Sequence, residues 1–289
     1  MPELPEVETI ARGLAKRVTG DVIESVWLGS KPEILKSPAA KIVSTLEGKR
    51  IANVRRVGKH IVFDLEDVGA GVPARAGATA SPARAGTPAP TSTRQWIVHL
   101  GMTGRMLVSQ AGAEVEKHTH AIARLSSGKE LRFVDPRRFG RLSVAHGFQA
   151  AGSEPLEVKL DRFVSLFRGR KTPIKSALLN QKLLSGVGNI YADESLFRAG
   201  IRPRRRAASL TREELQRLYQ AVQEVLREAI ALGGSSISDY VGADGEEGFF
   251  QLQHRVYGRE EEPCLVCKTE IKRVVIAGRS SHYCPKCQK

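Results

Sequence analysis

The cysteine spacing constrains this chain most, because all four cysteines lie near the C-terminus, in CLVC (264–267) and CPKC (284–287). Two such pairs, sixteen residues apart, are typical of a tetrahedral zinc site on two knuckles. Two independent redox motifs would need a βαβ context for which the C-terminus has no room. His282 lies nearby, but four thiolates already complete the shell. We therefore predict one structural Zn²⁺, which also supplies the folding energy of this short tail, bound by Cys264, Cys267, Cys284 and Cys287.

The charge balance indicates a polyanionic partner. Lys and Arg number 45 against 31 Asp and Glu, a formal net charge of +14, which favours nucleic acid. A membrane surface is the weaker alternative, because the chain has no apolar run of about 18 residues. Acidic residues occupy the place of a signal peptide, so we expect a cytoplasmic protein. With 289 residues, 41% of them hydrophobic, the chain has room for two domains and a small third module.

The first half of the chain has the pattern of one helix followed by β-structure. An apolar stripe at helical spacing runs from Val7 to Val18 and stops at Gly20. Segments rich in β-branched residues then alternate with turn signals to about residue 145, and a short helix is expected at 39–46. This pattern predicts an N-terminal β-sandwich with an N-terminal helix.

Residues 70–93 break that pattern. Of these 24 residues, 21 are Ala, Gly, Pro, Ser or Thr, and PARAG occurs twice. Such a composition has little to bury, so we predict a disordered insertion at a hairpin tip that is dispensable for folding and activity.

The second half changes to a helical period. Apolar residues recur at three and four spacing in segments 160–170, 172–184, 189–200 and 211–234, and Thr211 with Glu214 forms a capping box. A glycine-rich stretch follows, before the cysteines. We therefore predict an α+β multidomain chain with three parts, which are a β-sandwich domain at 1–150, an α-helical domain at 151–258 and a zinc-finger hairpin at 259–289.

The connection between the second and third of these helices contains Gly186 and Gly188, directly before Asn189. Glycines let backbone N–H groups approach a phosphate, and a helix N-terminus adds a favourable dipole. Two glycines between helices are also an ordinary helix–helix connection. The turn alone does not separate these interpretations.

Five motifs occur in an order that resembles one family. They are PELPEVET, HLGMTGR, DPRRFG, GVGNIYADESLF and the CLVC–CPKC pair, found in this order in bacterial formamidopyrimidine-DNA glycosylases. The resemblance covers almost the whole chain except residues 70–93. It implies a β-sandwich, a helix-two-turns-helix DNA-binding domain and a zinc ribbon. It also implies a monomeric DNA glycosylase and AP lyase that excises oxidised purines, 8-oxoguanine and formamidopyrimidines, from double-stranded DNA.

The resemblance assigns the chemistry to the N-terminus. In this family the initiator methionine is removed, and Pro2 becomes a secondary amine that attacks C1′ of the damaged nucleoside. The resulting iminium is an electron sink for β,δ-elimination. Glu3 is then the general acid and base, with Glu6 as a supporting group. The catalytic set implied by the resemblance is Pro2, Glu3, Lys59 and Arg279.

Further residues match the family's DNA contacts. Met102, Arg137 and Phe139 match the residues that fill the gap left by the extruded base, as an apolar plug, a donor to the orphaned cytosine and an aromatic wedge. The phosphate ligands implied by the resemblance, with His99 joining them, are Lys59, His99, Asn189 and Arg279. Residues 235–257 correspond to a lesion-recognition loop. No motif places the run RPRRR at 202–206, which we interpret as a nonspecific basic patch.

Two other functions compete with this one. An endonuclease-VIII-like glycosylase for oxidised pyrimidines shares the fold, zinc module and N-terminal proline, but PELPEV and the three gap-filling residues follow the purine-specific pattern. A noncatalytic zinc-ribbon nucleic-acid-binding protein explains the charge and cysteines, but has no use for Pro2 beside Glu3.

Overall fold

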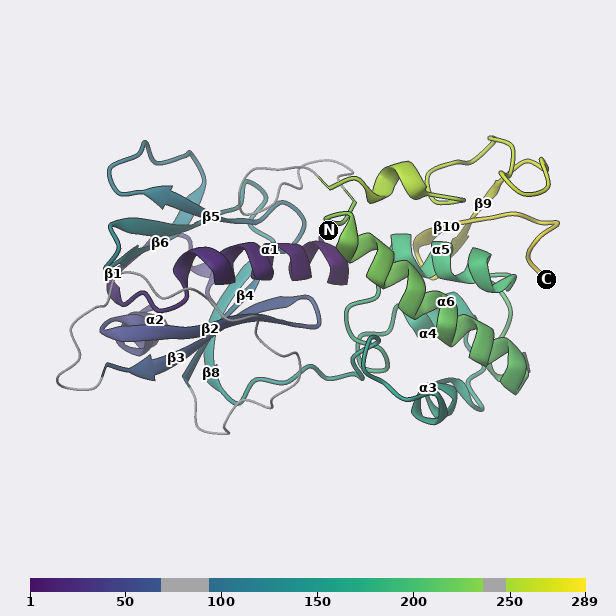
Figure 1. The fold of residues 1–289 in the computed structure, drawn as a ribbon, viewed down its shortest axis with the longest axis horizontal. Coiled ribbons are helices and arrows are strands. Elements are labelled where there is room, and N and C mark those ends of the chain that lie inside the picture. Colours follow the sequence, from purple (N-terminus) through teal and green to yellow (C-terminus); the bar gives the residue numbers. More distant parts are fainter. Residues whose placement is uncertain (69–93, 236–247) are drawn as a thin grey trace. The chain divides into compact units, whose positions relative to one another are not determined.

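The structure, a computed structural model, describes residues 1–68, 94–235 and 248–289. These residues form two compact units (Figure 1). The first comprises Met1, Ile10–Arg56 and His60–Gln149, and the second comprises Pro2–Thr9, Val57–Lys59 and Ala150–Lys289. The insertion predicted at 70–93 and most of the loop predicted at 235–257 lie outside the described residues. The three domain boundaries expected from the sequence stay predictions.

The first unit is built on two four-stranded sheets, in the orders β1-β6-β7-β5 and β2-β3-β4-β8 (Figure 1). Buried apolar side chains such as Phe63, Trp96 and Phe133 form its core. The predicted β-sandwich is confirmed. Its strands and short helices are β1 (Ile23–Leu28), η1 (Pro32–Ile34), α2 (Ala39–Leu46), β2 (Lys49–Val57), β3 (His60–Asp67), β4 (Arg94–His99), β5 (Arg105–Gln110), β6 (Thr119–Leu125), β7 (Lys129–Val134) and β8 (Arg141–His146).

Strands β3 and β4 form an antiparallel pair in register from His60↔His99 to Leu65↔Arg94. The segment 69–93 therefore connects two neighbouring strands of one sheet, as expected for an insertion between the strands of a hairpin.

Helix α1 (Leu4–Val18) contributes to both units, since its residues up to Thr9 belong to the second unit and those from Ile10 onward to the first. Its apolar stripe is buried, as the spacing predicts. The chain leaves the helix at Gly20, whose φ is +94° and whose amide donates to the Ile51 carbonyl at 2.8 Å. A glycine fits here because other residues rarely adopt this conformation.

The second unit is helical and ends in a two-stranded hairpin. Helices α5 and α6 pack side by side (Figure 1). The predicted capping box is present, because the Glu214 amide donates to Thr211 Oγ1 at 3.2 Å and the Thr211 amide to Glu214 Oε2 at 2.9 Å. The elements are α3 (Leu160–Phe167), α4 (Ile174–Leu178), α5 (Asn189–Ala199), η2 (Ala207–Ser209), α6 (Arg212–Ala231), η3 (Phe250–Gln253), β9 (Lys272–Ile276) and β10 (Arg279–Tyr283).

Helix α4 is shorter than the apolar spacing predicts: it ends at Leu178, whereas the apolar period continues to residue 184. Asn180 Oδ1 accepts the Lys182 amide at 3.0 Å, a local turn that competes with the helix. The Gln181 side chain then holds the following loop, accepting the Gly186 amide at 2.9 Å and donating to the Val187 carbonyl at 2.8 Å. None of the helices in the described ranges is long and apolar enough to cross a membrane.

Candidate active site and DNA-binding residues

The N-terminus of α5 receives a carboxylate of the protein itself. The Ile190 amide donates to Glu3 Oε1 at 3.2 Å, and the helix dipole favours the negative charge there. Gly188 makes the approach possible, since a Cβ at this position would lie 2.1 Å from Glu3 Cδ. The glycine turn that suits an anion is therefore occupied by Glu3.

Glu6 is a buried acceptor for three chain segments. Its Oε2 accepts the Glu3 amide at 2.8 Å, and its Oε1 accepts the Ser235 amide at 2.8 Å. The Tyr191 hydroxyl of α5 also donates to Oε1. Because the Glu3 amide belongs to the Pro2–Glu3 peptide, Glu6 restrains the backbone next to Pro2.

Lys59 is brought to these acids by a tight turn between β2 and β3. Gly58 has φ +60° and packs so closely on Ser185 that a Cβ would lie 2.2 Å from its hydroxyl oxygen. Lys59 is 8% exposed. Burial lowers the pKa of Lys59, while the charges of Glu3 and Glu6 oppose this shift and the charge of Arg279 adds to it. The structure therefore gathers Lys59, Glu3, Glu6 and Arg279 within mutual electrostatic reach.

The protonation of Glu3 is set by its environment. Burial raises the pKa of Glu3 from 4.5 to about 7, against the opposing charge of Lys59. Oε2 of Glu3 is buried and has no hydrogen-bond partner among the described residues. A carboxyl group with a pKa near neutrality can both donate and accept a proton at physiological pH.

This pKa predicts a pH-dependent stability. Because the pKa of Glu3 is about 7 in the folded protein and 4.5 in the unfolded chain, the folded protein keeps this proton between those two pH values while the unfolded chain loses it. The stability contributed by Glu3 is therefore full below pH 4.5 and is lost as the pH rises through 7. We expect Glu3→Gln to exceed the wild type in free energy of unfolding by about 1–3 kcal/mol at pH 8, and by under about 1 kcal/mol at pH 5. Urea unfolding at both pH values measures this, with Glu24→Gln on β1, an exposed acid, as control. An unchanged difference between the two pH values would contradict the assignment.

A second set of polar groups lies between α5 and β10. Asn189 Nδ2 donates to Ser280 Oγ at 3.2 Å, and the Asn189 side chain opposes the rise that burial causes in the pKa of Tyr257. Asn189 Oδ1 is buried without a partner among the described residues, which is typical of a functional site. Sequence reasoning missed Tyr257, because a single tyrosine in a glycine-rich stretch carries no spacing signal.

Arg279 is presented by a two-residue turn. Ala277 and Gly278 both have positive φ, +47° and +74°, as a type I′ turn requires. The register then pairs Arg279 with Ile276 at the tip of the β9–β10 hairpin, and the Arg279 side chain is exposed.

The predicted gap-filling residues lie on the surface of the first unit. Met102 is 42% and Phe139 48% exposed, so neither is a core residue. Arg137 Cζ stands 5.0 Å from the centre of the Phe139 ring, a cation–π contact. His99, at the end of β4, accepts the Gly101 amide on Nδ1 at 3.2 Å.

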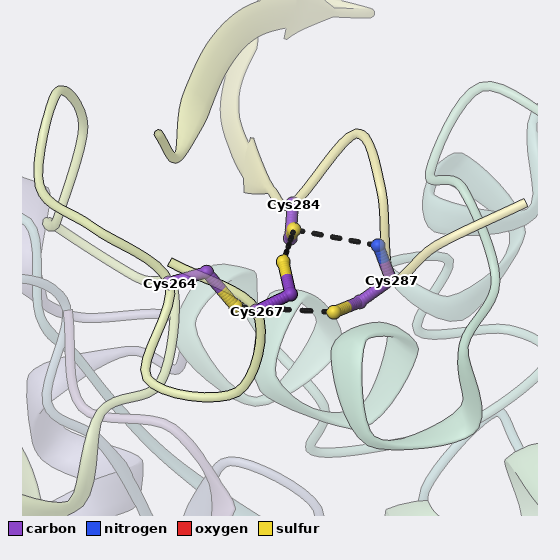
Figure 2. Close-up of side chains that lie close together, drawn as sticks. All are labelled: Cys264, Cys267, Cys284 and Cys287. Carbon is purple, nitrogen blue, oxygen red and sulfur yellow. Dashed lines mark hydrogen bonds between the residues drawn. The ribbon is translucent and has the colours of Figure 1, made fainter. Parts of the chain in front are cut away.

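The four cysteines converge on one point (Figure 2). Cys264 Sγ lies 3.9 Å from Cys287 Sγ, and Cys267 Sγ lies 3.4 Å from Cys284 Sγ. All four sulfur atoms lie within 4.8 Å of one another, close to the separation of about 3.8 Å that tetrahedral Zn–S bonds of about 2.3 Å require. His282 lies outside this set, because its Nδ1 is 3.3 Å from an Asp193 carboxylate oxygen.

Two arginines of the basic run at 202–206 make contacts within the protein, and the interpretation of the run as a nonspecific basic patch stays a prediction. Arg202 donates to the Pro285 carbonyl at 2.7 Å and to the Gln288 carbonyl at 2.9 Å, so it holds the second knuckle. Arg205 pairs with Glu214 of α6.

Comparison with known proteins identifies the family. Residues 1–142 match the formamidopyrimidine-DNA glycosylase N-terminal domain, 151–241 match the formamidopyrimidine-DNA glycosylase H2TH domain, and 261–289 match a zinc finger found in FPG and IleRS. The chain belongs to the formamidopyrimidine-DNA glycosylase family. The predicted family, fold class and structural zinc are thereby confirmed.

Individual relatives cover the whole chain. The formamidopyrimidine-DNA glycosylase of Solibacter usitatus is 43% identical over 294 residues and that of Gluconobacter oxydans 41% over 303, each with full coverage of both chains. The crystal structure of MutM from Thermus thermophilus is 40% identical in sequence and has a TM-score of 0.81, and the match covers 99% of this chain and 98% of that one. The Fpg of Lactococcus lactis in a complex with Fapy-dG DNA is 31% identical in sequence and has a TM-score of 0.83, and the match covers 99% of this chain and 100% of that one.

Proposed function

We propose that this chain is a bifunctional DNA glycosylase and AP lyase that excises 8-oxoguanine and formamidopyrimidines from duplex DNA. The observation that carries the proposal is the buried Glu3 carboxyl group, with its pKa raised to about 7, directly beside Pro2. Solved structures of relatives contain DNA with the matching damaged bases, since one MutM structure holds DNA with carbocyclic 8-oxo-G and one Lactococcus lactis Fpg structure holds DNA with Fapy-dG. The cytoplasm is the compartment we propose, because bacterial chromosomal DNA is there.

In the proposed reaction, removal of Met1 frees the Pro2 secondary amine. Its nitrogen forms a bond to C1′ while the bond from C1′ to the damaged base breaks, and the base leaves with the bonding electrons and takes up the amine proton. The bond from C1′ to the ring oxygen then breaks as Glu3 in its acid form protonates that oxygen, and the nitrogen lone pair forms the iminium with C1′. Removal of a C2′ proton by the Glu3 carboxylate then expels the 3′ phosphate, and a second elimination expels the 5′ phosphate.

The proposal assigns the remaining residues to holding the strand. Lys59, Asn189 and Arg279 contact phosphates, with His99 as a further ligand, because cationic and amide donors suit phosphate oxygens. The exposed side chain of Arg279 at the hairpin tip supports this assignment. The zinc ribbon supports the hairpin that carries Arg279.

Arg137 is proposed to read the orphaned base. Cytosine offers adjacent acceptors to a guanidinium, whereas adenine presents a donor beside its acceptor. We expect Arg137→Ala to reduce the preference for 8-oxoguanine opposite cytosine over the same lesion opposite adenine by about 1–3 kcal/mol. Single-turnover excision from the two duplexes measures this ratio, with exposed Arg124 of β6 replaced by Ala as control. Equal losses on both duplexes would show that Arg137 only positions the strand.

Covalent capture tests the whole proposal. Borohydride should reduce the imine and attach the processed protein irreversibly to a duplex with 8-oxoguanine opposite cytosine. Pro2→Gly should lose much of the adduct while still binding DNA, and protein shown by intact mass to retain Met1 should form none, because an amide nitrogen is not a nucleophile. A thymine-glycol duplex trapped better than the 8-oxoguanine duplex would indicate the pyrimidine-specific alternative. No adduct with either lesion, from protein lacking Met1, would overturn the enzymatic proposal.

A further inference from the structure

Two surface segments of the first unit carry the gap-filling residues. One is the turn after β4, residues 100–104, with Met102 at its exposed tip, and the other is the turn after β7, residues 135–140, with Arg137 and Phe139. The sequence separates them by about thirty residues. Strands β5 and β7 bring them together, because Arg105 pairs with Val134 at one end of the ladder.

One buried carboxylate joins the two segments. Asp135 is 0% exposed, and its Oδ1 accepts the Thr103 hydroxyl at 2.6 Å. The same carboxylate accepts the Arg137 amide at 3.2 Å on Oδ1 and the Gly140 amide at 2.7 Å on Oδ2. Asp135 therefore ties both ends of its own turn and, through Thr103, the neighbouring turn.

The backbones of the two segments are also in contact. Gly101 has φ +67°, and a Cβ there would lie 2.5 Å from both the Gly140 nitrogen and the Phe139 carbonyl carbon. Thr103 is only 8% exposed, so its hydroxyl is held inside the contact. Arg137 and Phe139 add their own cation–π contact on the outside, at 5.0 Å.

We propose that the Thr103 hydroxyl and the Asp135 carboxylate are positioning groups that make Met102, Arg137 and Phe139 one rigid insertion element. The inference rests on the proposed function, because it assumes that these three side chains enter the gap left by the extruded base. Filling that gap requires the side chains of Met102, Phe139 and Arg137 to enter it together. Without the Thr103–Asp135 hydrogen bond, only the backbone contact at Gly101 holds the turn of Met102 against the turn of Arg137 and Phe139, and part of the ordering cost falls on the extrusion step.

The test compares Thr103→Val with Thr103→Ser. Valine keeps the shape and removes the donor, which leaves a buried carboxylate oxygen short of one hydrogen bond, whereas serine keeps the hydroxyl. We expect Thr103→Val to slow excision of 8-oxoguanine opposite cytosine about tenfold or more and to narrow the preference for cytosine over adenine. Thr103→Ser should stay within about twofold of the wild type. The control is Thr45→Val, which removes a hydroxyl bonded to the Lys41 carbonyl within α2, remote in sequence from both turns.

A readout without a duplex separates positioning from general damage. Cleavage of an abasic single strand needs no gap to be filled, so Thr103→Val should cleave it at the wild-type rate. If Thr103→Val lost the same fraction of its cleavage rate on the single strand and on the duplex, Thr103 and Asp135 would have only a structural role. Unchanged excision from the duplex, with an unchanged preference for cytosine over adenine, would overturn the inference. If Thr103→Val melts too early to assay, Thr103→Ala, which also removes the donor to Asp135, should show the same duplex-specific loss. Failure of the proposed function is distinct, because Met102→Ala and Phe139→Ala would then leave duplex excision unchanged.

Discussion

Gly188→Ala is expected to lower base excision by about 100-fold or more while leaving the protein folded. The φ of Gly188 is −128°, a conformation that alanine adopts without strain. Its new Cβ would lie 2.1 Å from Glu3 Cδ and 2.3 Å from Oε1. A flexible carboxylate end can move aside at small cost to stability, but it then leaves the Ile190 amide. Loss of a positioned general acid and base costs about 10²–10⁴ in rate.

Three measurements test this expectation. Single-turnover excision of 8-oxoguanine should fall, whereas the Gly188→Ala variant should cleave a preformed abasic site with a smaller loss, because the base is already gone. The free energy of unfolding should stay within about 1 kcal/mol of the wild type, since Gly→Ala also reduces the entropy of the unfolded chain. Gly29→Ala is the control, because the atoms nearest to its added Cβ lie at 3.4–3.5 Å. If Gly188→Ala excised 8-oxoguanine at the wild-type rate, Glu3 would not be the general acid and base of the reaction.

Features set by local spacing were predictable from the sequence. The helix of residues 39–46, the stop at Gly20 and the Thr211–Glu214 capping box all follow from nearest neighbours along the chain. The zinc site was predictable for the same reason, because each knuckle is a local pair and only the two knuckles must meet. The end of α4 was missed because the apolar period continues beyond it, while the Asn180 and Gln181 side chains hold a turn instead.

Contacts between distant parts of the chain were not predictable from spacing. Glu3 and Ile190 are 187 positions apart, and no periodic pattern connects an acid before one helix to the N-terminus of another. The glycine that admits Glu3 has the same sequence context as one that admits a phosphate. The Thr103–Asp135 bond and the hold of Arg202 on the second knuckle belong to the same class, since they depend on strand register and domain packing.

Removal of the zinc is expected to lower the affinity for a lesion-containing duplex by about 100-fold or more, with little effect on the β-sandwich. The ribbon has almost no core of its own, because its buried cluster consists of Val256, Ile271 and the cysteines Cys264 and Cys284. Structural zinc supplies about 10–16 kcal/mol to small modules of this kind. No comparable apolar burial can replace it here.

The contacts that dock the hairpin explain why metal loss reaches the DNA. Lys175 donates to the Ser280 carbonyl at 2.5 Å, and the His282 amide donates to Asp193 at 2.9 Å. These bonds form only when β10 is folded, and β10 carries Arg279 beside Asn189's partner Ser280. A metal-free ribbon would therefore lose Arg279 and release the Asn189 side chain together, which removes more than one of the proposed phosphate contacts.

The decisive comparison sets metal loss against the loss of one contact. The double variant Cys264→Ser, Cys267→Ser and chelator-treated wild type should both show weak binding to an 8-oxoguanine duplex by fluorescence anisotropy, with zinc content measured on the same samples. Arg279→Ala should keep its zinc and lose a smaller part of the affinity, with a salt slope lower by about one. Val275→Ser, at a 63% exposed position on β9, should bind like the wild type. Metal-free protein that binds the duplex with wild-type affinity would contradict both the folding role of the zinc and the place of the hairpin in the DNA interface.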